Sequence, residues 1–399
     1  MCGFTGLSLA APFPWAENAL HRMTDAIAHR GPDSDGFHVV PPHTSLLGFR
    51  RLAIRDLDPR ANQPMQTGSA RTTIAFNGEI YNSQDLASDY CSHVSLKTSG
   101  DTEVLAEAFE SVGESVFEKC NGMFAAAFLD RDTGTITLIR DRIGKKPLYM
   151  HEGNGFIAFA SELRCFEPFQ LEWDSETLPS YFQFGHYPAP LTAFRNTTQL
   201  RPGESVIVKD GRILARRLWH DFTNLGWGVR TAVDLNELDH TLADAVAIRT
   251  LSDVPVGAFL SGGIDSSLVA AQLKASGHST VPTFTVAFDN ETHNEAPFAV
   301  EIAKHLGLEQ IEIKIDPGSL PDLVSDYVDC YEQPYADSSG LPSMALCREV
   351  KKYVTVALTG DGGDEFFGGY QRYEWFQKAL KAQKLPATFR QLVGTAFPL

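Results

Sequence analysis

Residues 254–271, VPVGAFLSGGIDSSLVAA, constrain the fold more than any other stretch of this chain. An apolar run leads into Ser261-Gly262-Gly263, and a segment rich in alanine and leucine follows. This order predicts a buried strand, a tight turn and a helix. Glycines allow close approach to the backbone, and the first N–H groups of a helix have no partner within it. The stretch therefore predicts a loop that binds an anion such as phosphate.

Asp265, at the start of the predicted helix, limits the kinds of ligand that this loop can bind. A carboxylate repels a bare phosphate, but it shares a hard divalent ion such as Mg²⁺ with phosphate oxygens. The chain has neither the glycine-lysine phosphate loop of kinase-like nucleotide enzymes nor a dinucleotide-binding glycine fingerprint after a strand. The plain alternative is a glycine-rich turn that ends a buried strand and binds nothing.

Strands and helices are predicted to alternate around this loop. After it we expect strands at 281–288, 310–315 and 353–358, and a helix at 295–306 capped by Asn294. Before it, a helix with one buried face is expected from Ala232, Leu235, Leu238, Leu242 and Val246. Such alternation is typical of a doubly wound parallel sheet, an α/β fold whose ligands bind beyond the carboxyl ends of the strands.

Residues 359–370, TGDGGDEFFGGY, form a second glycine-rich turn, at the carboxyl end of the last predicted strand. Two such turns on adjacent strand ends would bring Asp265 and Asp364 to one Mg²⁺–pyrophosphate group. SGGIDSS at 261–267 resembles the pyrophosphate loop of ATP pyrophosphatases. This resemblance implies that backbone groups at Val286 and Gly360 hold adenosine. A solvated acidic loop is the alternative interpretation of this stretch.

The bulk composition limits the classes of function. A chain of 399 residues exceeds the size at which one core usually keeps growing, so two domains are expected. A formal net charge of -16 argues against nucleic-acid and anionic-membrane partners. The six cysteines form no C-x-x-C pair, and no signal peptide or membrane-length apolar run is evident. We therefore expect a cytoplasmic protein, in a reducing compartment, that acts on small molecules.

Cys2 becomes the first residue of the chain if the initiator methionine is removed. Its α-amino group titrates near ~8 and its thiol near ~8.5, so the amine can accept the thiol proton and act as the general base. A cysteine so placed would be a nucleophile that needs no histidine. The plain alternative is a small apolar residue at the start of a strand.

Five further segments accompany Cys2. They are HRGPDSDG at 29–36, RLAI at 51–54, NQPM at 62–65, FNGEIYN at 76–82 and SGDTE at 99–103. Together with Cys2, and in this order, they resemble the signatures of class II glutamine amidotransferases. The resemblance implies an N-terminal-nucleophile (Ntn) hydrolase domain, an α+β sandwich in which antiparallel sheets are packed between helices (αββα).

The same resemblance implies roles for particular residues. The Asn77 side chain and the Gly78 N–H would stabilise the oxyanion that forms when Cys2 attacks glutamine. The glutamine-binding residues would be Arg51 for the α-carboxylate, Asp101 for the α-ammonium group, and Ile54, Asn77 and Glu79 around the substrate. Taken singly, Arg51 and Asp101 are equally typical of solvated surface charges.

Three motifs in the second half extend the resemblance. SGGIDSS at 261–267, EQPYAD at 332–337 and TGDGGDEFFGGY at 359–370, following a class II glutaminase, resemble glutamine-hydrolysing asparagine synthetases. The implied domains are a glutaminase at residues 2–210 and an ATP-pyrophosphatase domain at residues 230–399. In that family ATP activates the aspartate carboxylate as an acyl-adenylate, and ammonia from glutamine converts it to asparagine, with AMP and pyrophosphate released.

This resemblance implies ATP and Mg²⁺ as cofactors, and it suggests a homodimer. The implied ATP-binding residues are Leu260, Ser261, Gly262, Gly263, Asp265, Ser266, Ser267, Val286, Thr359 and Gly360. Asp265 and Asp364 would hold the metal, and Asp361 would belong to the loop at the acceptor and adenylate. Segments 140–149 and 159–162 are expected to be core strands and interdomain surface without a catalytic role.

Three departures from the family pattern leave alternatives open. Phe49 stands where family members often have histidine, and Asp361 where asparagine synthetases often have glutamate. Family chains also continue beyond Leu399 with a segment that carries a lysine, so we expect a fragment or a shortened paralogue. The alternatives are an amidotransferase for another carboxylate in a secondary-metabolite or surface-polysaccharide pathway, and a glutaminase or glutamine-binding regulatory paralogue that makes no amide.

Overall fold

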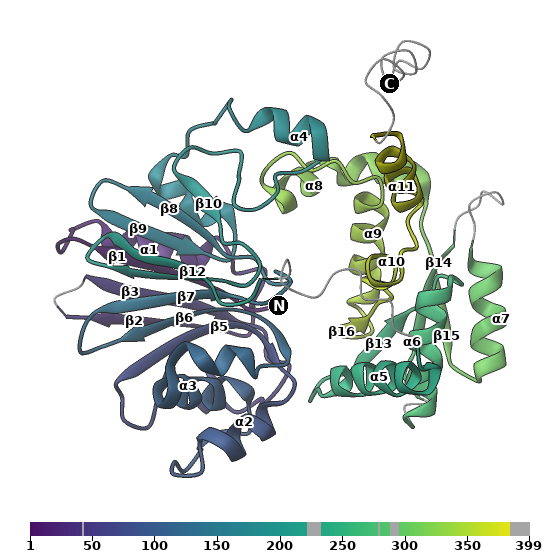
Figure 1. The fold of residues 1–399 in the computed structure, drawn as a ribbon, viewed down its shortest axis with the longest axis horizontal. Helices are drawn as coiled ribbons and strands as arrows, with labels where there is room; N and C mark the ends of the chain where they lie inside the picture. The colour runs from purple at the N-terminus through teal and green to yellow at the C-terminus, as the bar shows by residue number, and fades with distance from the viewer. Residues whose placement is uncertain (42–43, 222–232, 278–279, 288–294, 384–399) are drawn as a thin grey trace. The chain divides into compact units, whose positions relative to one another are not determined.

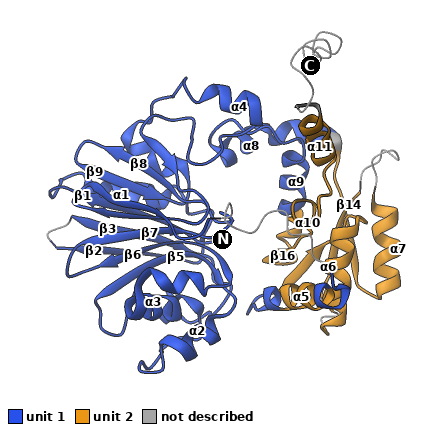
Figure 2. Cartoon of the chain, viewed as in Figure 1, with its two compact units in different colours: residues 1–238, 248–254, 318–348 blue, residues 239–247, 255–317, 349–399 orange. Residues whose placement is uncertain are grey.

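The computed structural model describes residues 1–41, 44–221, 233–277, 280–287 and 295–383. The chain divides into two compact units (Figure 2). Unit 1 comprises Met1–Leu238, Ile248–Val254 and Gly318–Arg348, and unit 2 comprises Asp239–Ala247, Pro255–Pro317 and Glu349–Leu399. Each unit is therefore discontinuous in sequence. Residues 222–230 of the expected boundary region lie outside the described residues.

Two six-stranded antiparallel sheets form the body of unit 1 (Figure 1). The first consists, in order across it, of β10 (Thr197–Gln199), β8 (Tyr149–Gly153), β9 (Phe156–Ala160), β1 (Gly3–Leu9), β3 (Ser45–Arg51) and β2 (Ser34–Val40). The second consists of β12 (Arg212–Leu218), β11 (Glu204–Lys209), β7 (Thr135–Arg140), β6 (Gly122–Asp130), β5 (Thr72–Ile80) and β4 (Met65–Gln66). Strands β6 and β7 form a hairpin around Gly134, with Asp130 paired opposite Thr135.

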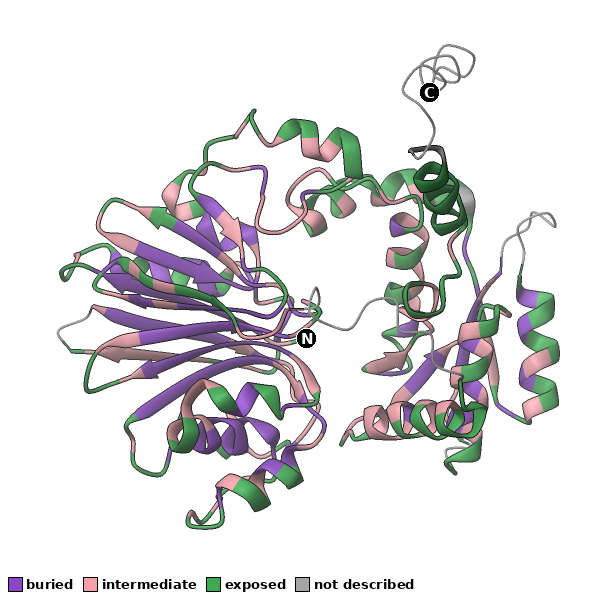
Figure 3. Ribbon diagram, viewed as in Figure 1, coloured by how far each residue is buried: buried purple, intermediate pink, exposed green. Residues whose placement is uncertain are grey.

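The two sheets share an apolar core, and helices cover their outer faces (Figure 3). Phe4, Phe49 and Phe159 of the first sheet pack against Ala127 and Leu138 of the second. The helical elements are α1 (Ala16–Asp25) and the 3₁₀ helix η3 (Leu163–Phe169) on the first sheet, and α2 (Ser83–Tyr90), α3 (Asp101–Val112) and η2 (Gly113–Glu118) on the second. The predicted αββα sandwich is therefore confirmed.

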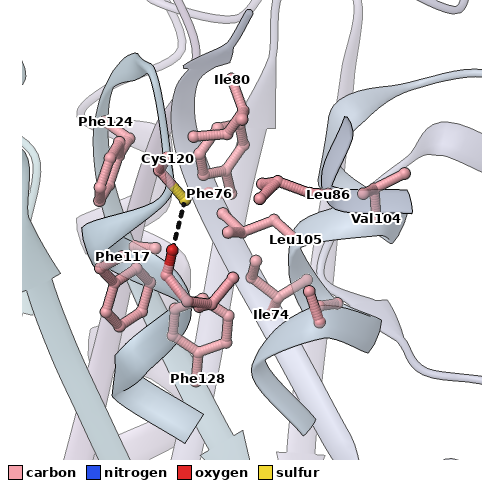
Figure 4. Close-up of a cluster of buried hydrophobic side chains, with 14 of the residues drawn as sticks. Ile74, Phe76, Ile80, Leu86, Val104, Leu105, Phe117, Cys120, Phe124 and Phe128 are labelled. Atoms are coloured by element: carbon pink, nitrogen blue, oxygen red, sulfur yellow. Dashed lines mark hydrogen bonds between the residues drawn. The ribbon is translucent and has the colours of Figure 1, made fainter. Parts of the chain in front are cut away.

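The core beneath α3 fixes the strand that carries the FNGEIYN motif. Ile74 and Phe76 of β5 and Phe128 of β6 pack against Leu105 of α3 (Figure 4). Leu105, Ile74 and Phe128 are almost completely buried. Each large buried side chain contributes about 1.5–3 kcal/mol through removal from water. Because side chains alternate along a strand, this face of β5 is anchored while its other face is directed away from α3.

Unit 1 also contains a segment from the second half of the chain, Gly318–Arg348. Its elements are η7 (Pro317–Leu323), α8 (Val324–Tyr331) and α9 (Gly340–Val350), and other short elements of the unit are η1 (Pro59–Ala61), α4 (Leu178–Phe184) and η5 (Ile248–Thr250). Gln333 Oε1 accepts a hydrogen bond from Ala193 N at 3.0 Å, and Ala336 N donates to Gly185 O at 2.7 Å. These bonds join the segment to the sandwich.

Unit 2 is built on a four-stranded parallel sheet in the order β15 (Gln310–Lys314), β14 (Thr283–Ala287), β13 (Val256–Phe259), β16 (Val356–Leu358). Its helices are α5 (Leu235–Ala247), α6 (Ile264–Ala275), α7 (Ala296–Leu306), α10 (Gly363–Phe367) and α11 (Gln371–Gln383). The chain runs outward from β13 through β14 to β15 and then returns to β16 on the other side of β13. The strand order therefore reverses between β13 and β16, and in such sheets ligands bind at this switch point.

The predicted parallel sheet is confirmed, but some details differ. Strand β16 begins at Val356, not at Tyr353, because the N–H groups of Tyr353 and Val354 bond back to Val350 O at 2.9 and 3.1 Å. The predicted buried face of α5 is wrong at Leu235, which is the first residue of the helix and 74% exposed. The predicted cap Asn294 and the predicted helix residue Ala232 lie outside the described residues. Among the described helices, none is both long and apolar enough to span a membrane.

Candidate active sites

Cys2 lies directly before β1, near the centre of the first sheet. All seven residues of β1 are buried, so the strand holds its first residues rigidly. The Cys2 Sγ accepts a hydrogen bond from Leu52 N at 3.4 Å, and the Cys2 carbonyl accepts one from Arg30 Nε at 2.9 Å. Burial raises the pKa of the Cys2 thiol, while the Leu52 N–H and the charges of Arg51 and Arg30 act in the opposite direction.

Asn77 and Gly78 lie in β5, opposite Ala125 and Phe124 of β6. The Asn77 side chain is 1% exposed, and its Nδ2 is buried without a hydrogen-bond partner among the described residues. An unsatisfied buried donor costs about 1–3 kcal/mol, so a native structure keeps one for a reason. At position 78 a methyl group would lie 2.3 Å from Met123 O, so the strand has room only for glycine there. The Asn77 donor is free for an acceptor supplied by a ligand.

Glu79 and Asp101 form an acidic pair around Arg55. Arg55 Nη1 lies 3.4 Å from Glu79 Oε1 and 3.9 Å from Asp101 Oδ2, and Asp101 Oδ2 also accepts from Ile80 N at 2.7 Å. Burial and repulsion by Asp101 raise the pKa of Glu79 to about 7. Burial also raises the pKa of Asp101, although Arg55 and the N–H of Ile80 oppose this. Two buried acids that share one base form a site suited to a cation.

Arg51 is held by the loop that follows it. Its guanidinium donates to Asn62 Oδ1 at 2.6 Å, to Asp58 O at 3.1 Å and to Asp56 O. Its side chain is buried, and its charge acts on the thiol of Cys2. Ile54, in the same turn, accepts a hydrogen bond from Asp253 N through its carbonyl at 2.9 Å. Arg51 thus lies close to Cys2 with part of its hydrogen-bonding capacity already used by the chain.

Three further charged groups that were not assigned to the site from the sequence belong to this neighbourhood: Arg30, Arg55 and Lys146. Lys146 Nζ lies 3.1 Å from Met1 Sδ. Burial and the charge of Arg30 lower the pKa of Lys146 to about 8, whereas Cys2 and Glu79 are among the groups that raise it. Lys146 is therefore near enough to both Cys2 and Glu79 for their charges to act on its pKa. The only sequence signal for Arg55 was its position directly after the RLAI motif.

The SGGIDSS loop of unit 2 connects β13 to α6, as predicted. Its serines bond to one another and to the loop backbone: Ser261 Oγ lies 2.9 Å from Ser266 Oγ, Gly263 N donates to Ser261 Oγ at 3.2 Å, and Ser267 Oγ donates to Gly263 O at 2.6 Å. Gly262 has φ +85°, and a methyl group there would lie 2.9 Å from Phe298 Cβ, so the turn requires glycine. Leu260 is buried, while Ser261 and Gly263 are exposed.

The second glycine-rich loop lies directly against the first. A methyl group on Gly363 would lie 2.4 Å from the carboxyl carbon of Asp265, and one on Gly360 would lie 2.8 Å from Ser266 N. Both loops follow parallel strands that pair with each other, β13 and β16. In the second loop Thr359 Oγ1 donates to Asp361 Oδ2 at 3.0 Å. Val286 is the residue before the last of β14, on the other side of β13.

The predicted metal ligands are Asp265, in the first turn of α6, and Asp364, in α10. Asp364 follows Gly363, whose α-carbon packs on the Asp265 carboxylate, so the two acids come from loops in contact. No group of three or more His, Cys, Asp or Glu side chains suited to a metal occurs among the described residues. Mg²⁺ is commonly held by one or two carboxylates together with substrate phosphates, so this donor set fits Mg²⁺ bound with a nucleotide.

Two family profiles match the chain in succession. The profile "Glutamine amidotransferase domain" matches residues 1–219, and the profile "Asparagine synthase" matches residues 237–396. The first profile covers unit 1 up to the end of the sandwich, which contains Cys2, Asn77 and Asp101. The second contains both glycine-rich loops of unit 2, and also segment 318–348 of unit 1.

Curated relatives match over almost the whole chain. Glutamine-hydrolysing asparagine synthetase 1 of Bacillus subtilis is 34% identical over 98% of this chain and 62% of its own length. A Methanocaldococcus jannaschii protein, provisionally named glutamine-hydrolysing asparagine synthetase 2, is 31% identical over 100% of this chain and 81% of its own length. A Gibberella zeae protein named amidase chry2 is 30% identical over 89% of this chain and 55% of its own length.

The chain thus spans about three fifths of the length of the Bacillus subtilis relative. Its two profiles occur in the order that the sequence motifs predicted, and the Methanocaldococcus jannaschii relative is matched over most of its length. The chain belongs to the family of glutamine-hydrolysing asparagine synthetases.

Proposed function

We propose that this chain is an ATP-dependent amide ligase that hydrolyses glutamine at Cys2 and transfers the ammonia to an activated carboxylate, that of aspartate. The observation that carries the glutaminase half is the buried, unpartnered Nδ2 of Asn77, in the same unit as a cysteine that precedes a rigid strand. The contact between two glycine-rich loops at the switch point of the unit 2 sheet supports the ligase half.

The glutaminase step begins with removal of Met1, which makes the α-amine of Cys2 the general base. The amine takes the thiol proton, and the thiolate attacks the side-chain amide carbon of glutamine. The negative charge that develops on the amide oxygen is stabilised by Asn77 Nδ2 and the Gly78 N–H. The amine then gives its proton to the departing ammonia, which leaves a thioester for water to hydrolyse.

Charged residues around Cys2 would orient the substrate. Asp101 and Glu79 form the acidic side of the site, which suits the α-ammonium group of glutamine. Arg51, with Ile54 in the same turn, would receive the α-carboxylate through its remaining N–H capacity. Arg55 lies near both acids, and its charge opposes the rise of their pKa values that burial causes.

The ligase step would take place at the loops that follow β13 and β16. We propose that the backbone and hydroxyl groups of 260–267, with Thr359 and Gly360, bind ATP, and that Val286 lies beside the adenosine. Bound Mg²⁺, held by Asp265 and Asp364, would neutralise the charge of the pyrophosphate. Asp361 would face the acceptor carboxylate, which attacks the α-phosphorus of ATP. This attack breaks the bond to the β-phosphate, releases pyrophosphate and forms an acyl-adenylate, from which ammonia then displaces AMP.

The cellular setting follows from the same proposal. All six cysteines are free, in keeping with a reducing, cytoplasmic compartment.

The suggested homodimer is tested by light scattering of the purified chain.

The deciding experiment measures three products from glutamine, ATP, Mg²⁺ and aspartate: glutamate, pyrophosphate and asparagine. Wild type is expected to form all three, and the Cys2→Ala variant is expected to form pyrophosphate and asparagine only when ammonia is added. Glutamate without pyrophosphate, under any tested carboxylate, would contradict the ligase half. If pyrophosphate release depends on a different carboxylic acid, that acid and not aspartate is the acceptor. The relative named as an amidase makes this outcome worth testing.

A further inference from the structure

A row of alternating charges runs from the backbone of Cys2 to Glu332 within unit 1. Arg30 donates through Nε to the Cys2 carbonyl oxygen at 2.9 Å and through Nη1 to Glu162 Oε1 at 2.8 Å. Arg164 Nε lies 3.0 Å from Glu162 Oε2 and 2.6 Å from Glu332 Oε1. Each of the two inner charges, Glu162 and Arg164, therefore has an opposite charge on both sides.

Most of this row is withdrawn from water. The side chains of Arg30, Glu162 and Glu332 are 9%, 12% and 10% exposed, and that of Arg164 is 30% exposed. Charges in such positions are screened little by salt, and loss of one partner leaves the next charge uncompensated. His29 Nε2 also lies 3.1 Å from Glu162, so Glu162 is the point where several groups meet.

The orientation of the Arg30 guanidinium depends on Glu162. Its Nη2 is buried and has no hydrogen-bond partner among the described residues, so the guanidinium is held at Nε by the Cys2 carbonyl and at Nη1 by Glu162. Hydrogen bonds from His29 and Arg30 keep the pKa of Glu162 below its ordinary value in spite of burial. Glu162 is therefore an ionised partner that fixes the orientation of Arg30 on the peptide group of the nucleophile.

The far end of the row comes from a distant part of the sequence. Glu332 accepts hydrogen bonds from Leu163 N at 2.7 Å and Arg164 N at 2.9 Å, which fixes its carboxylate on the start of η3. It belongs to the region matched by the "Asparagine synthase" profile, yet it lies in unit 1. Gln333, next in the chain, holds the same segment by a hydrogen bond that involves no charge.

We propose that Glu332 is a positioning residue for the glutamine-hydrolysing site: through Arg164 and Glu162 it holds Arg30 on the Cys2 carbonyl, and so makes the orientation of the nucleophile depend on the charge that segment 318–348 supplies at Glu332. This inference rests on the proposed glutaminase function and deepens it. The Arg30–carbonyl bond fixes the peptide plane of Cys2 and with it the directions of the thiol and the α-amine. Glu332 contacts none of the proposed glutamine-binding residues, so it acts on turnover and not on affinity.

The test uses the full chain and the variant Glu332→Gln, which keeps the shape of the side chain and removes its charge. We expect kcat for glutamine hydrolysis to fall about five-fold, the size typical of coupling through a charge network, while KM changes by less than about two-fold. Glu332→Asp, which keeps the charge, is expected to recover part of the loss. Alkylation of Cys2 by chloroacetamide without glutamine, followed on the N-terminal peptide by mass spectrometry, should slow about three-fold with the Glu332→Gln variant.

Gln333→Ala is the matched control, because it removes a contact of the same segment without touching the charges. It is expected to leave kcat within about two-fold of wild type, whatever it does to thermal stability. A double-mutant cycle gives the second test: Glu332→Gln and Glu162→Gln together should lower kcat no more than Glu162→Gln alone, whereas Gln333→Ala and Glu162→Gln should combine multiplicatively.

Three results would overturn the proposal: unchanged kcat and alkylation with Glu332→Gln, an equal loss with Gln333→Ala, or multiplicative effects of Glu332→Gln and Glu162→Gln. Failure of the proposed function gives a different pattern. If wild type hydrolyses no glutamine, the glutaminase assignment is wrong, and the alkylation rates of Cys2 still decide whether Glu332 acts on it.

Discussion

The two candidate sites of this chain hold their residues in different ways. In unit 1, Asn77, Arg51 and Asp101 are 1%, 6% and 7% exposed and belong to strands and a helix start that the core fixes. In unit 2, Ser261, Gly263 and Asp361 are exposed, and the loops bond mainly to their own serine and threonine hydroxyls. The first site is preorganised by a sheet, whereas the second is a pair of loops whose remaining donors and acids await a ligand.

The difference teaches what each chemistry needs. An amide oxyanion is small and short-lived, so its donors have to be fixed before the substrate arrives, and a buried, unpartnered Asn77 Nδ2 meets that condition. A nucleotide with its metal is large and brings its own charges, so glycine turns that allow close approach are sufficient. Variants in unit 1 should therefore lower activity because the donors for the oxyanion are no longer fixed in place. Variants in unit 2 should lower activity because the charge of the bound nucleotide is no longer neutralised.

The largest effect is expected from Cys2→Ala. Glutamine hydrolysis should fall by about 10³-fold or more, because no other described group can replace the thiolate. Pyrophosphate release supported by added ammonia should stay unchanged, since the loops of unit 2 are untouched. Glutamate formation is measured by a coupled assay, and hydrolysis that survives in this variant would mean that the nucleophile lies elsewhere.

Asn77→Ala tests the preorganised donor directly. We expect kcat for glutamine hydrolysis to fall about 10²–10³-fold, the usual loss for one oxyanion donor, with a much smaller change in KM. Asn82→Ala is the matched control, because Asn82 ends the same motif and donates to Lys119 O on the surface. Steady-state kinetics of both variants decide the point: equal losses would show that the motif matters only for folding.

Asp265→Asn tests the loops of unit 2. Pyrophosphate release should fall about 10²-fold, because a metal that neutralises phosphate charge is worth several kcal/mol, and more Mg²⁺ should be needed for half-maximal rate. Glu365→Gln, in the second loop but paired with Tyr370, should change the rate little. Glutaminase activity measured in the same preparations should be unaffected, and a parallel loss of both activities would contradict the separation of the two sites.

The smallest expected effect is a pH dependence carried by Glu79. Because the pKa of Glu79 is raised to about 7, its carboxyl group is neutral below that pH and ionised above it. An ionised group is needed beside the substrate ammonium, so kcat/KM for glutamine should rise with pH through about 7 and fall up to about tenfold for each unit below. Glu79→Gln should remove this limb, and a pH profile that keeps it would assign the titration to another group.

The sequence alone was sufficient to predict the local structure wherever the motif lies within a few consecutive residues. Cys2, the FNGEIYN strand and the SGGIDSS turn each carry their signal within a few residues, and alternation of strands and helices is visible along the chain. The contact of the two glycine-rich loops was also predictable, because parallel strands direct their carboxyl ends to one edge. The structure confirms the sandwich, the parallel sheet and the neighbouring loops, while the roles of the site residues stay predictions.

Long-range contacts were not predictable in the same way. Arg55 belongs to the acidic pair only because β5 and the first turn of α3 meet there, and the ion pair of Arg164 with Glu332 joins residues 168 positions apart. No spacing in the sequence encodes such a pair. Leu235 was assigned to a buried face from helical periodicity, but periodicity does not say where a helix stops packing.

The discontinuity of unit 1 has a consequence for biosynthesis. The sandwich strands are complete by Leu218, but the unit also requires Gly318–Arg348, which brings Glu332 to Arg164. A ribosome must release the chain through residue 348 before this part of unit 1 can form. By then β13, α6, β14 and β15 have also been synthesised. A truncated nascent chain that ends at the sandwich would therefore carry Cys2 without Glu332. Unit 1 is completed only after the first three strands of the unit 2 sheet have been synthesised.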